Sequence, residues 1–559
     1  MRVDEEALRL LGVRPEEARK NGLLLAVGLA GGGAALAALG VLAKQVLYLY
    51  AAIALFALAP VLYLYPVLEL SSRVRRVESE LFPAAVYMSL YATAGRDMVE
   101  GLYALAKERG VAPSFAKFVE NVERLRVQRL MGTPHEALAE AARRFEGSRL
   151  SAVLLSAATA RSVGISQEIQ ARDLLKSVLF ELKSAYQRLV DSLKTLSEVV
   201  LVFYGVLPLM MLVMASMFYS EGSRLMLLSY VFLLIPLMGV GLVYLVHYMY
   251  PKTPESFLRE YRRYLFALPI GAAVGFASYF LLAGALPRPR IEAAGLFNPA
   301  VVADGVAKAY AVAVALGLAA AAAFAYVAVY YIAEARRRWG IISALPYFTR
   351  DMAEMVKLGY SPAQALPRIV QRRSYGKYFD RLLTAVGRRL VGGTFADAVK
   401  QEAAKAPWIA SVILSAVGEA ERLGSKAEVF ADVADAARDV VDIMRAARAG
   451  IRGAVIFGII TVVIISVLLG VVAKQLLFQV ASQAAGLKAV GQAPLSIQLV
   501  TFDKVPDVLA LSLVGAVLNA VVLGIIIGKI SDDNFLASSL YGLAAAAIAT
   551  AAVLASVFF

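Results

Sequence analysis

The chain has 559 residues, 60% of them hydrophobic, and its mean hydropathy is +0.67, whereas soluble globular proteins are about half apolar. The absence of cysteine excludes disulfides, thiolate nucleophiles and cysteine-ligated metals, and two histidines are too few for a histidine-rich metal site, so we expect no cofactor. The formal charge of +14 would suggest nucleic acid in a soluble protein, but basic residues also collect on the cytoplasmic side of membrane proteins, so we expect no nucleic-acid partner.

The first 22 residues carry five acidic and five basic side chains, which predicts a short amphipathic helix rather than the basic start of a signal peptide. Nine apolar segments follow, most of them long enough to cross the hydrocarbon core of about 30 Å. The first two are nearly continuous, and we predict a tight helical hairpin with Lys44 at its turn. The nine predicted spans are 22–43, 47–69, 197–219, 225–249, 264–286, 306–333, 452–473, 506–528 and 535–558.

Two charged blocks interrupt the apolar segments, and both show helical periodicity without alternating β-type runs. We therefore predict an all-α, polytopic membrane protein with about nine transmembrane helices and two duplicated cytoplasmic helical bundles. The predicted division is an N-terminal amphipathic segment and two spans at 1–70, a first bundle at 71–196, four spans at 197–333, a second bundle at 334–451, and three C-terminal spans at 452–559.

The basic residues orient the chain, because Lys and Arg concentrate on the cytoplasmic side of the membrane. With the N-terminus inside and nine crossings, 49 of the 57 basic residues fall in inside segments, counting Arg452 at the edge of the second bundle. This predicts a multi-pass plasma-membrane protein whose N-terminus and bundles are cytoplasmic and whose C-terminus is outside.

The two charged blocks align with each other at residues typical of turns. Phe82-Pro83 matches Leu345-Pro346 at an offset of 263. Four spans, an even number, separate the blocks, so both face the same side, and the chain is predicted to be a parallel tandem repeat. Three pairs of glycines, which we expect to be structural, recur at offsets of 264, 261 and 260: Gly95 and Gly359, Gly132 and Gly393, and Gly164 and Gly424.

Three segments of the second block resemble a known family in their order and spacing. They are Gly359-Tyr360-Ser361-Pro362-Ala363-Gln364-Ala365-Leu366, Gly393-Thr394-Phe395-Ala396-Asp397-Ala398-Val399 and Ala420-Glu421-Arg422-Leu423-Gly424. The first two resemble helix starts, and the third the Gly-Glu-x-x-Gly segment, of the type II secretion system F domain. Ala420 departs from the family's leading glycine, and Arg161 replaces the acid in the first block. Nine spans and long blocks are more similar to the archaeal pilus and archaellum branch of that family.

The resemblance implies a non-enzymatic membrane platform that works with a hexameric secretion ATPase and with pilin or archaellin subunits. It also implies a homo-oligomer such as a dimer. The sequence agrees, because it contains no Gly-x-x-x-x-Gly-Lys-Ser/Thr loop, so that ATP must be hydrolysed by a partner. A pilus, an archaellum and a secretion pseudopilus remain alternative filaments.

Charged residues on the bundles are candidates for docking the ATPase. The first block has 19 basic and 14 acidic residues, and the second, taken as 334–452, has 20 and 13, so both would attract an acidic surface. The basic residues could instead lie on solvated helix faces or contact lipid headgroups. The two glutamates could be plain surface acids, ATPase contacts or links between the bundles. The candidates are Arg124, Arg126, Arg129, Arg372, Arg373, Lys377, Glu419 and Glu421.

Small residues in the spans are candidates for contact with an apolar pilin helix, with packing inside the chain as the alternative. They are Gly31-Gly32-Gly33 and Gly40 in the first span, and Gly515 and Gly524 in the eighth. The competing interpretation of the whole chain is a tandem-repeat membrane transporter or channel. The spans contain almost no ionisable residues near their centres, which argues against ion-coupled transport.

Overall fold

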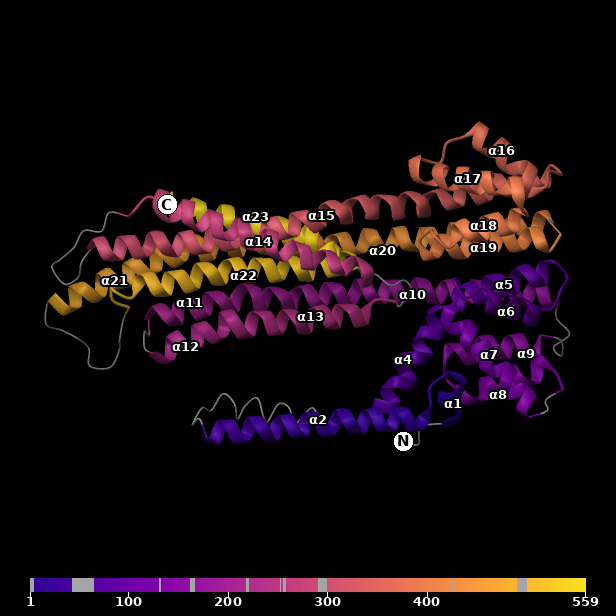
Figure 1. The fold of residues 1–559 in the computed structure, drawn as a ribbon, viewed down its shortest axis with the longest axis horizontal. Coiled ribbons are helices and arrows are strands. Elements are labelled where there is room, and N and C mark those ends of the chain that lie inside the picture. The colour runs from indigo at the N-terminus through magenta and orange to yellow at the C-terminus, as the bar shows by residue number, and fades with distance from the viewer. Residues whose placement is uncertain are drawn as a thin grey trace. The chain divides into compact units, whose positions relative to one another are not determined.

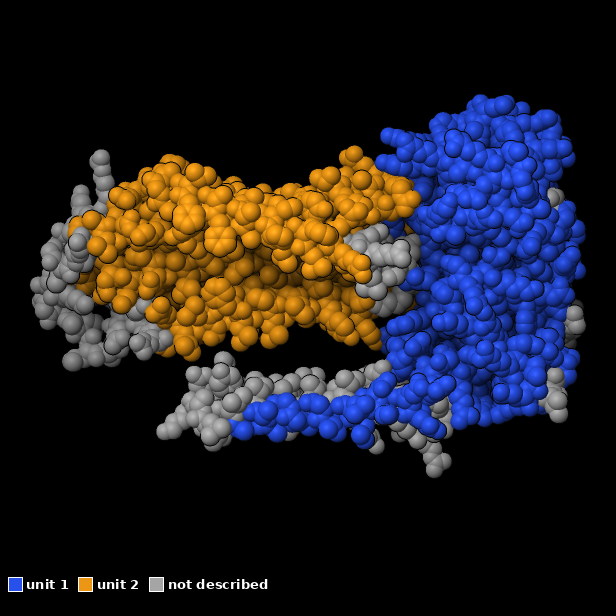
Figure 2. All heavy atoms as spheres, viewed as in Figure 1, with its two compact units in different colours: residues 1–183, 252–255, 338–442 blue, residues 184–251, 256–337, 443–559 orange. Residues whose placement is uncertain are grey.

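The computed structural model describes residues 5–42, 65–129, 132–160, 166–217, 221–251, 253–254, 258–289, 299–424, 426–489 and 500–558. Over these residues the chain forms helices and no strand, so the all-α prediction is confirmed (Figure 1). The chain divides into two compact units (Figure 2). Unit 1 comprises residues 1–183, 252–255 and 338–442, and unit 2 comprises residues 184–251, 256–337 and 443–559.

Unit 1 contains most of both charged blocks, but residues 184–196, 334–337 and 443–451 belong to unit 2. The unit begins with α1 (Glu5–Leu10), α2 (Pro15–Leu42) and α4 (Tyr65–Ser79), and the helices that follow form two sets, here called repeat 1 and repeat 2. Repeat 1 consists of α5 (Leu81–Thr93), α6 (Met98–Lys107), α7 (Pro113–Gln128), α8 (Pro134–Arg144), α9 (Arg149–Thr159) and the start of α10 (Gln167–Leu201). Repeat 2 consists of the end of α15 (Pro299–Lys357), α16 (Pro362–Arg372), α17 (Lys377–Arg389), the short η3 (Leu390–Gly392), α18 (Phe395–Ala403), α19 (Trp408–Arg422) and the start of α20 (Ala427–Val467). The helices follow one another in the same order, as the duplication predicts.

The first matching turn of each repeat is closed by a glycine in the left-handed region. Gly95 has φ +79° and Gly359 has φ +90°, values at which an L side chain is strained. Each donates its N–H to the carbonyl three residues back, and the next residue donates five residues back, which ends α5 and α15 in the same way. The sequence match at these glycines therefore reflects one turn geometry that both repeats share.

The second matching turn starts a helix with a threonine cap. The Thr133 hydroxyl accepts the Glu136 N–H at 3.3 Å, and the Thr394 hydroxyl accepts the Asp397 N–H at 3.2 Å. Each satisfies a helix N–H that has no backbone partner. Gly393, next to its threonine, is extended, and Gly424 closes α19 with φ +100°. Gly132 is exposed before Thr133, and Gly164 lies outside the described residues.

The repeats differ where they begin. Repeat 1 breaks between α4 and α5 at Glu80, whereas α15 runs through the matching position without interruption. The buried Glu80 carboxylate accepts the N–H groups of Ser114 at 3.2 Å and Phe115 at 2.7 Å, at the start of α7. Burial raises the pKa of Glu80, although these hydrogen bonds oppose the rise.

Unit 2 is built from long apolar helices that pack side by side (Figure 1). Its core of aliphatic side chains includes residues from the ends of α10 and α20 and from α13 and α22. Beyond the long helices that begin in unit 1 or run into it, its elements are α11 (Leu207–Met217), α12 (Glu221–Ser229), α13 (Ile235–Met249), α14 (Leu258–Ala285), α21 (Ala473–Ala489), α22 (Val505–Ser531) and α23 (Ala537–Phe558), with π-helices η1 (Val202–Val206), η2 (Tyr230–Leu234) and η4 (Leu468–Val472).

Seven helical stretches of the described residues are long and apolar enough to cross a membrane, and they coincide with the third to ninth predicted spans. A multi-pass membrane protein is therefore confirmed. The first predicted span falls in α2, which is not among the seven, and most of the second lies outside the described residues, as does the turn at Lys44. The total of nine spans stays a prediction.

Two glycines of the eighth predicted span serve packing inside unit 2. A Cβ on Gly524 would lie 2.7 Å from the Tyr541 carbonyl oxygen, and one on Gly515 would lie 2.9 Å from a Val231 methyl. Only a missing side chain allows helices to approach this closely. The structure thus supports the packing alternative for these two glycines.

Candidate functional site

The two repeats meet inside unit 1 along α5 and α19. All 13 residues of α5 are buried, as are the 13 consecutive residues Trp408–Ala420 of α19. A helix buried on every side has no water-facing stripe, and the apolar sequence of α5 agrees with that position. Any movement of one repeat relative to the other must therefore disturb this junction.

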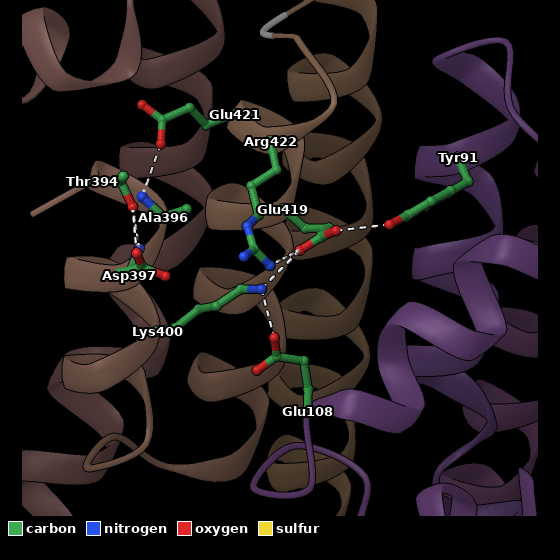
Figure 3. Close-up of polar contacts among 9 residues, drawn as sticks. All are labelled: Tyr91, Glu108, Thr394, Ala396, Asp397, Lys400, Glu419, Glu421 and Arg422. Atoms are coloured by element: carbon green, nitrogen blue, oxygen red, sulfur yellow. Dashed lines mark hydrogen bonds and ion pairs between the residues drawn. The ribbon is translucent and has the colours of Figure 1, made fainter. Parts of the chain in front are cut away.

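A buried lysine links the repeats at the centre of the junction (Figure 3). The Lys400 Nζ on α18 lies 2.8 Å from the Glu419 Oε2 on α19 and 2.5 Å from the Glu108 Oε1 of repeat 1. The Tyr91 hydroxyl of α5 donates to the other Glu419 oxygen at 2.8 Å. Side-chain exposures of 12% for Lys400 and 6% for Glu419 mean that water screens these interactions little. We call these four residues the Lys400 cluster.

The Lys400 cluster keeps Glu419 ionised. Burial alone would raise the pKa of Glu419, but hydrogen bonds from Lys400 and Tyr91, together with the nearby Arg422, hold it below its ordinary value. Burial and the bond to this carboxylate raise the pKa of Tyr91, so its hydroxyl remains a donor. The expectation that Glu419 is a plain surface acid is wrong, and the alternative of a link between the bundles is correct.

Further contacts extend the junction on both sides of the cluster. The Trp408 indole N–H donates to the Val111 carbonyl at 2.8 Å, so this tryptophan is both buried and part of the contact between repeats. The Thr93 hydroxyl donates to Asp432 at 2.6 Å, and Arg172 pairs with the same carboxylate at 3.2 Å. Hydrogen bonds and close packing together make the junction specific in geometry.

Glu421 has a different role from Glu419, although the two are separated by one residue. Its carboxylate accepts the Ala396 N–H at 2.8 Å and so caps the first turn of α18 (Figure 3). Burial, with the nearby Asp397 adding to it, raises the pKa of Glu421. Glu421 and Arg422 line a shallow groove at the start of α18, together with Ala363, Leu390, Gly393, Thr394, Phe395, Ala396 and Asp397.

The predicted basic cluster of repeat 1 is largely neutralised within the chain. Arg126 pairs with Glu123 at 2.6 Å, and Arg129 pairs with Glu6 of α1 at 2.6 Å. Arg124 is exposed. The acidic side of the short helix α1 thus occupies part of the surface that the sequence alone assigns to an acidic partner.

The predicted basic cluster of repeat 2 faces solvent. Arg372, Arg373 and Lys377 are all exposed around the turn between α16 and α17. The Arg373 guanidinium lies 5.0 Å from the ring centre of Tyr347 and 5.7 Å from that of Tyr375, which orients the charge without neutralising it.

A comparison of equivalent positions in the two repeats explains why the surface of repeat 2 formed by α15, α16 and α17 stays exposed. Three residues of α5 are apolar or uncharged and buried, but their counterparts on α15 are charged and exposed. The side of repeat 2 formed by α15, α16 and α17 is therefore built for water or a polar partner rather than for apolar packing. At an offset of 264, Val86, Leu90 and Thr93 correspond to Arg350, Glu354 and Lys357.

Three residues of the junction, Lys400, Glu108 and Tyr91, were not predicted from the sequence. Nothing in a single sequence distinguishes a buried lysine on an amphipathic helix from a solvated one. The contacts between the repeats join residues far apart along the chain: Lys400 and Glu108 are 292 positions apart, and Tyr91 and Glu419 are 328 positions apart. The one available signal was the unusually apolar α5, which implies a covering partner.

Residues 348–473 match the family described as Type II secretion system (T2SS), protein F. These residues form a T2SS F domain. The domain begins in the last turns of α15, contains α16 to α20 and η4, and ends in the first residue of α21. The F domain therefore includes the whole predicted basic cluster of repeat 2 and the Lys400 and Glu419 side of the junction. No curated protein and no solved structure matches the chain. An F domain joined to several membrane-spanning helices indicates a membrane platform protein of a secretion or pilus assembly system.

Proposed function

We propose that the chain is the non-enzymatic platform of a type IV pilus-like or archaellum assembly machine. In this proposal a cytoplasmic secretion ATPase binds unit 1, and its motion is passed to the spans, which move pilin or archaellin subunits into a filament. The chain acts as a homo-oligomer, and its N-terminus and both repeats are cytoplasmic. The observation that carries the proposal is the F domain placed directly on a buried junction between two repeats.

The junction supports a mechanical role, because force applied to one repeat is transmitted to the other only if the two move together. The Lys400 cluster, the Trp408 bond and the Thr93–Asp432 bond connect them through groups that are mostly buried. A partner that binds repeat 2 alone would thereby move repeat 1 as well.

The charge of repeat 2 supports docking of an acidic partner on its α16–α17 side. Arg372 and Lys377 are exposed, whereas Arg126 and Arg129 of repeat 1 are paired inside the chain. Exposed charges act mainly on the rate of association and lose their effect in high salt. We therefore assign docking to repeat 2 rather than to the repeat 1 cluster.

The test measures how tightly the purified secretion ATPase of the same organism binds the full-length chain in nanodiscs. Two matched sets of charge reversals in the chain are compared. The triple change Arg372→Glu, Arg373→Glu and Lys377→Glu is expected to weaken binding at low salt by about tenfold or more. The control triple change Arg124→Glu, Arg126→Glu and Arg129→Glu is expected to weaken it much less, provided that circular dichroism shows the fold intact. Equal weakening would refute the assignment to repeat 2, and no binding by the unaltered chain would refute the platform proposal itself.

A further inference from the structure

The long helices α10 and α20 meet at residues that are equivalent in the two repeats. Each is a continuous α-helix that begins in unit 1 and ends in unit 2. In unit 1 Arg172 pairs with Asp432 at 3.2 Å, and in unit 2 Val190 lies against Gly450. Both pairs are separated by 260 positions, the offset found between the last pair of turn glycines. Equivalent positions of the duplication therefore face each other.

A third pair of equivalent residues shows that this register continues beyond α10. Gly205 of η1 lies beside Ile465 of α20, again 260 positions apart, and a Cβ on this glycine would lie 3.5 Å from the Ile465 Cδ1. A helix that runs from Arg172 to Gly205 rises by about 50 Å. Contacts at one offset over this length mean that the two helices run parallel and are not displaced along each other.

The first two pairs lie on one face of each helix. Positions 172 and 190 are 18 residues apart, as are 432 and 450, and 18 residues make five full turns of an α-helix. The partners are complementary rather than alike, since an arginine meets an aspartate and a valine meets a glycine. Two copies of α10 paired in the same way would instead bring like charges and two valines together, so the contact favours the two repeats of one chain.

The glycine at position 450 allows the two helices to approach in only one register. A Cβ on Gly450 would lie 2.7 Å and 2.9 Å from the two methyl carbons of Val190. A valine in a helix has one strongly preferred rotamer, so these methyl groups cannot turn away. A displacement by one turn would place Ala446 or Ala454 opposite Val190, and the Cβ of either alanine would meet the same obstacle. It would also separate the arginine from the aspartate in unit 1.

We propose that Gly450 is a positioning residue that locks α10 and α20 in one register, so that both repeats move the membrane spans together. The inference rests on the proposed platform function and names the element that carries motion out of unit 1. Both helices continue into predicted spans, the third from α10 and the seventh from α20. A shift of one helix along its axis is therefore passed to the other at Gly450 and at the Arg172–Asp432 pair.

The first test joins the two helices in the register of the structure. Arg172→Cys and Asp432→Cys are introduced into the cysteine-free, full-length chain and expressed in the source organism, whose own copy of the gene is deleted. A short, membrane-permeant reagent links the two thiols, filaments are sheared off, and their regrowth is counted by electron microscopy. If the helices move as one, linked cells regrow filaments as fast as the reagent-treated single variant Arg172→Cys. Loss of regrowth in the linked cells alone shows that the helices must slide, and overturns the proposal.

The second test exchanges the side chains that set the register. Gly450→Val alone is expected to abolish regrowth, and the addition of Val190→Gly is expected to restore it. Gly453→Val is the matched control, because no atom lies within 4 Å of a Cβ at this glycine of the same helix, and it should leave regrowth unchanged. An exchange without recovery, at an unchanged amount of protein in the membrane, overturns the proposal.

The deletion strain separates this proposal from the platform function on which it rests. Cells without the chain should lack filaments, and the unaltered chain should restore them. Filaments that persist without the chain would refute the platform function, whereas the linked and exchanged variants test only the register. If Gly450→Val does not reach the membrane, the result in the linked cells decides.

Discussion

The side chain of Lys400 contributes strongly to the stability of the junction between the repeats, because it pairs with two carboxylates, those of Glu108 and Glu419. Replacement by methionine keeps most of the volume but leaves the buried Glu419 with only one of its two cations, the more distant and exposed Arg422 at 3.7 Å. Breaking a buried pair from one side commonly costs about 3–5 kcal/mol, so we expect Lys400→Met to lower the free energy of unfolding of unit 1 by about 3 kcal/mol. Both tryptophans, Trp339 and Trp408, belong to unit 1, so fluorescence during denaturation in detergent measures this change.

The control for that measurement is Lys405→Met, just beyond the end of the same helix. Lys405 also pairs with a buried carboxylate, that of Glu402, at 2.8 Å, but its own side chain is 62% exposed, and Arg389 remains beside the same carboxylate at 2.6 Å. Its loss is expected to cost below about 1 kcal/mol. Similar losses for Lys400 and Lys405 would show that the junction does not depend on the buried cation.

The ionisation of Glu419 predicts a pH dependence with a definite sign. Its pKa in the folded protein lies below the ordinary value of 4.5, so the folded state favours the charged form. The resulting stability is fully present above the unfolded-state pKa and is lost as the pH falls through the lower, folded-state pKa. We expect the fluorescence midpoint of unit 1 to fall as the pH is lowered below about 4.5, and to fall less steeply in Glu419→Gln.

Glu80 should oppose this trend weakly. Its pKa is raised by burial, so its contribution declines as the pH rises through the interval between its unfolded-state and folded-state values. The single variants separate the two carboxylates, because Glu419→Gln removes the acid-induced loss and Glu80→Gln removes the opposing slope, while the double variant removes both. Acid sensitivity that is unchanged in Glu419→Gln would contradict the assignment.

At the scale of elements, the turn glycines explain why the duplication was visible in the sequence. Gly359 ends α15 with φ +90°, and no atom lies within 4 Å of the place where a Cβ would be, so an alanine there would suffer backbone strain rather than a clash. We expect Gly359→Ala to destabilise unit 1 by about 1 kcal/mol or more. Gly387, inside α17 with open space around it, is the control, and Gly387→Ala should stabilise by up to about 1 kcal/mol. The same sign at both positions in thermal denaturation would contradict this interpretation.

The elements also show which parts of the fold the sequence could predict. Helix starts with Ser or Thr and turns with glycine obey local rules, so Ser361, Thr394 and Gly359 could be placed without a structure. The ends of the long helices could not, because the predicted span 306–333 is only the apolar part of α15, which continues as a charged helix to Lys357. Hydropathy changes there, but backbone hydrogen bonding does not.

Tertiary contacts set the limit for the candidate site. The sequence placed Arg129 in an open basic cluster, but Glu6, 123 positions away, neutralises it through α1. In repeat 2 the corresponding region is organised differently, with Arg389 and Lys405 around the buried Glu402. The same arrangement of helices thus carries a basic surface that is covered by α1 in repeat 1 and a basic surface that is exposed in repeat 2. Only contacts between residues far apart in the sequence distinguish the two cases.

For the whole molecule, the remaining question is the side of the membrane on which unit 1 lies. The chain has no cysteine, so single substitutions introduce unique labelling positions without a background. Ser114→Cys in repeat 1 and Ser374→Cys in repeat 2 are both expected to react with a membrane-impermeant maleimide only after the cytoplasmic side is opened, because most basic residues lie on that side. Ser482→Cys, exposed on α21 beyond the seventh predicted span, should react from outside in intact cells.

The three labels together test the parallel repeat as well as the orientation. An even number of spans between the repeats requires Ser114→Cys and Ser374→Cys to behave alike, whichever side they occupy, whereas an odd number would separate them. Reaction of both from outside would reverse the orientation but retain the tandem architecture. Reaction of the two from opposite sides would be incompatible with the hydrogen bonds that join Tyr91 to Glu419 and Trp408 to Val111, since these bonds need both repeats in one compartment.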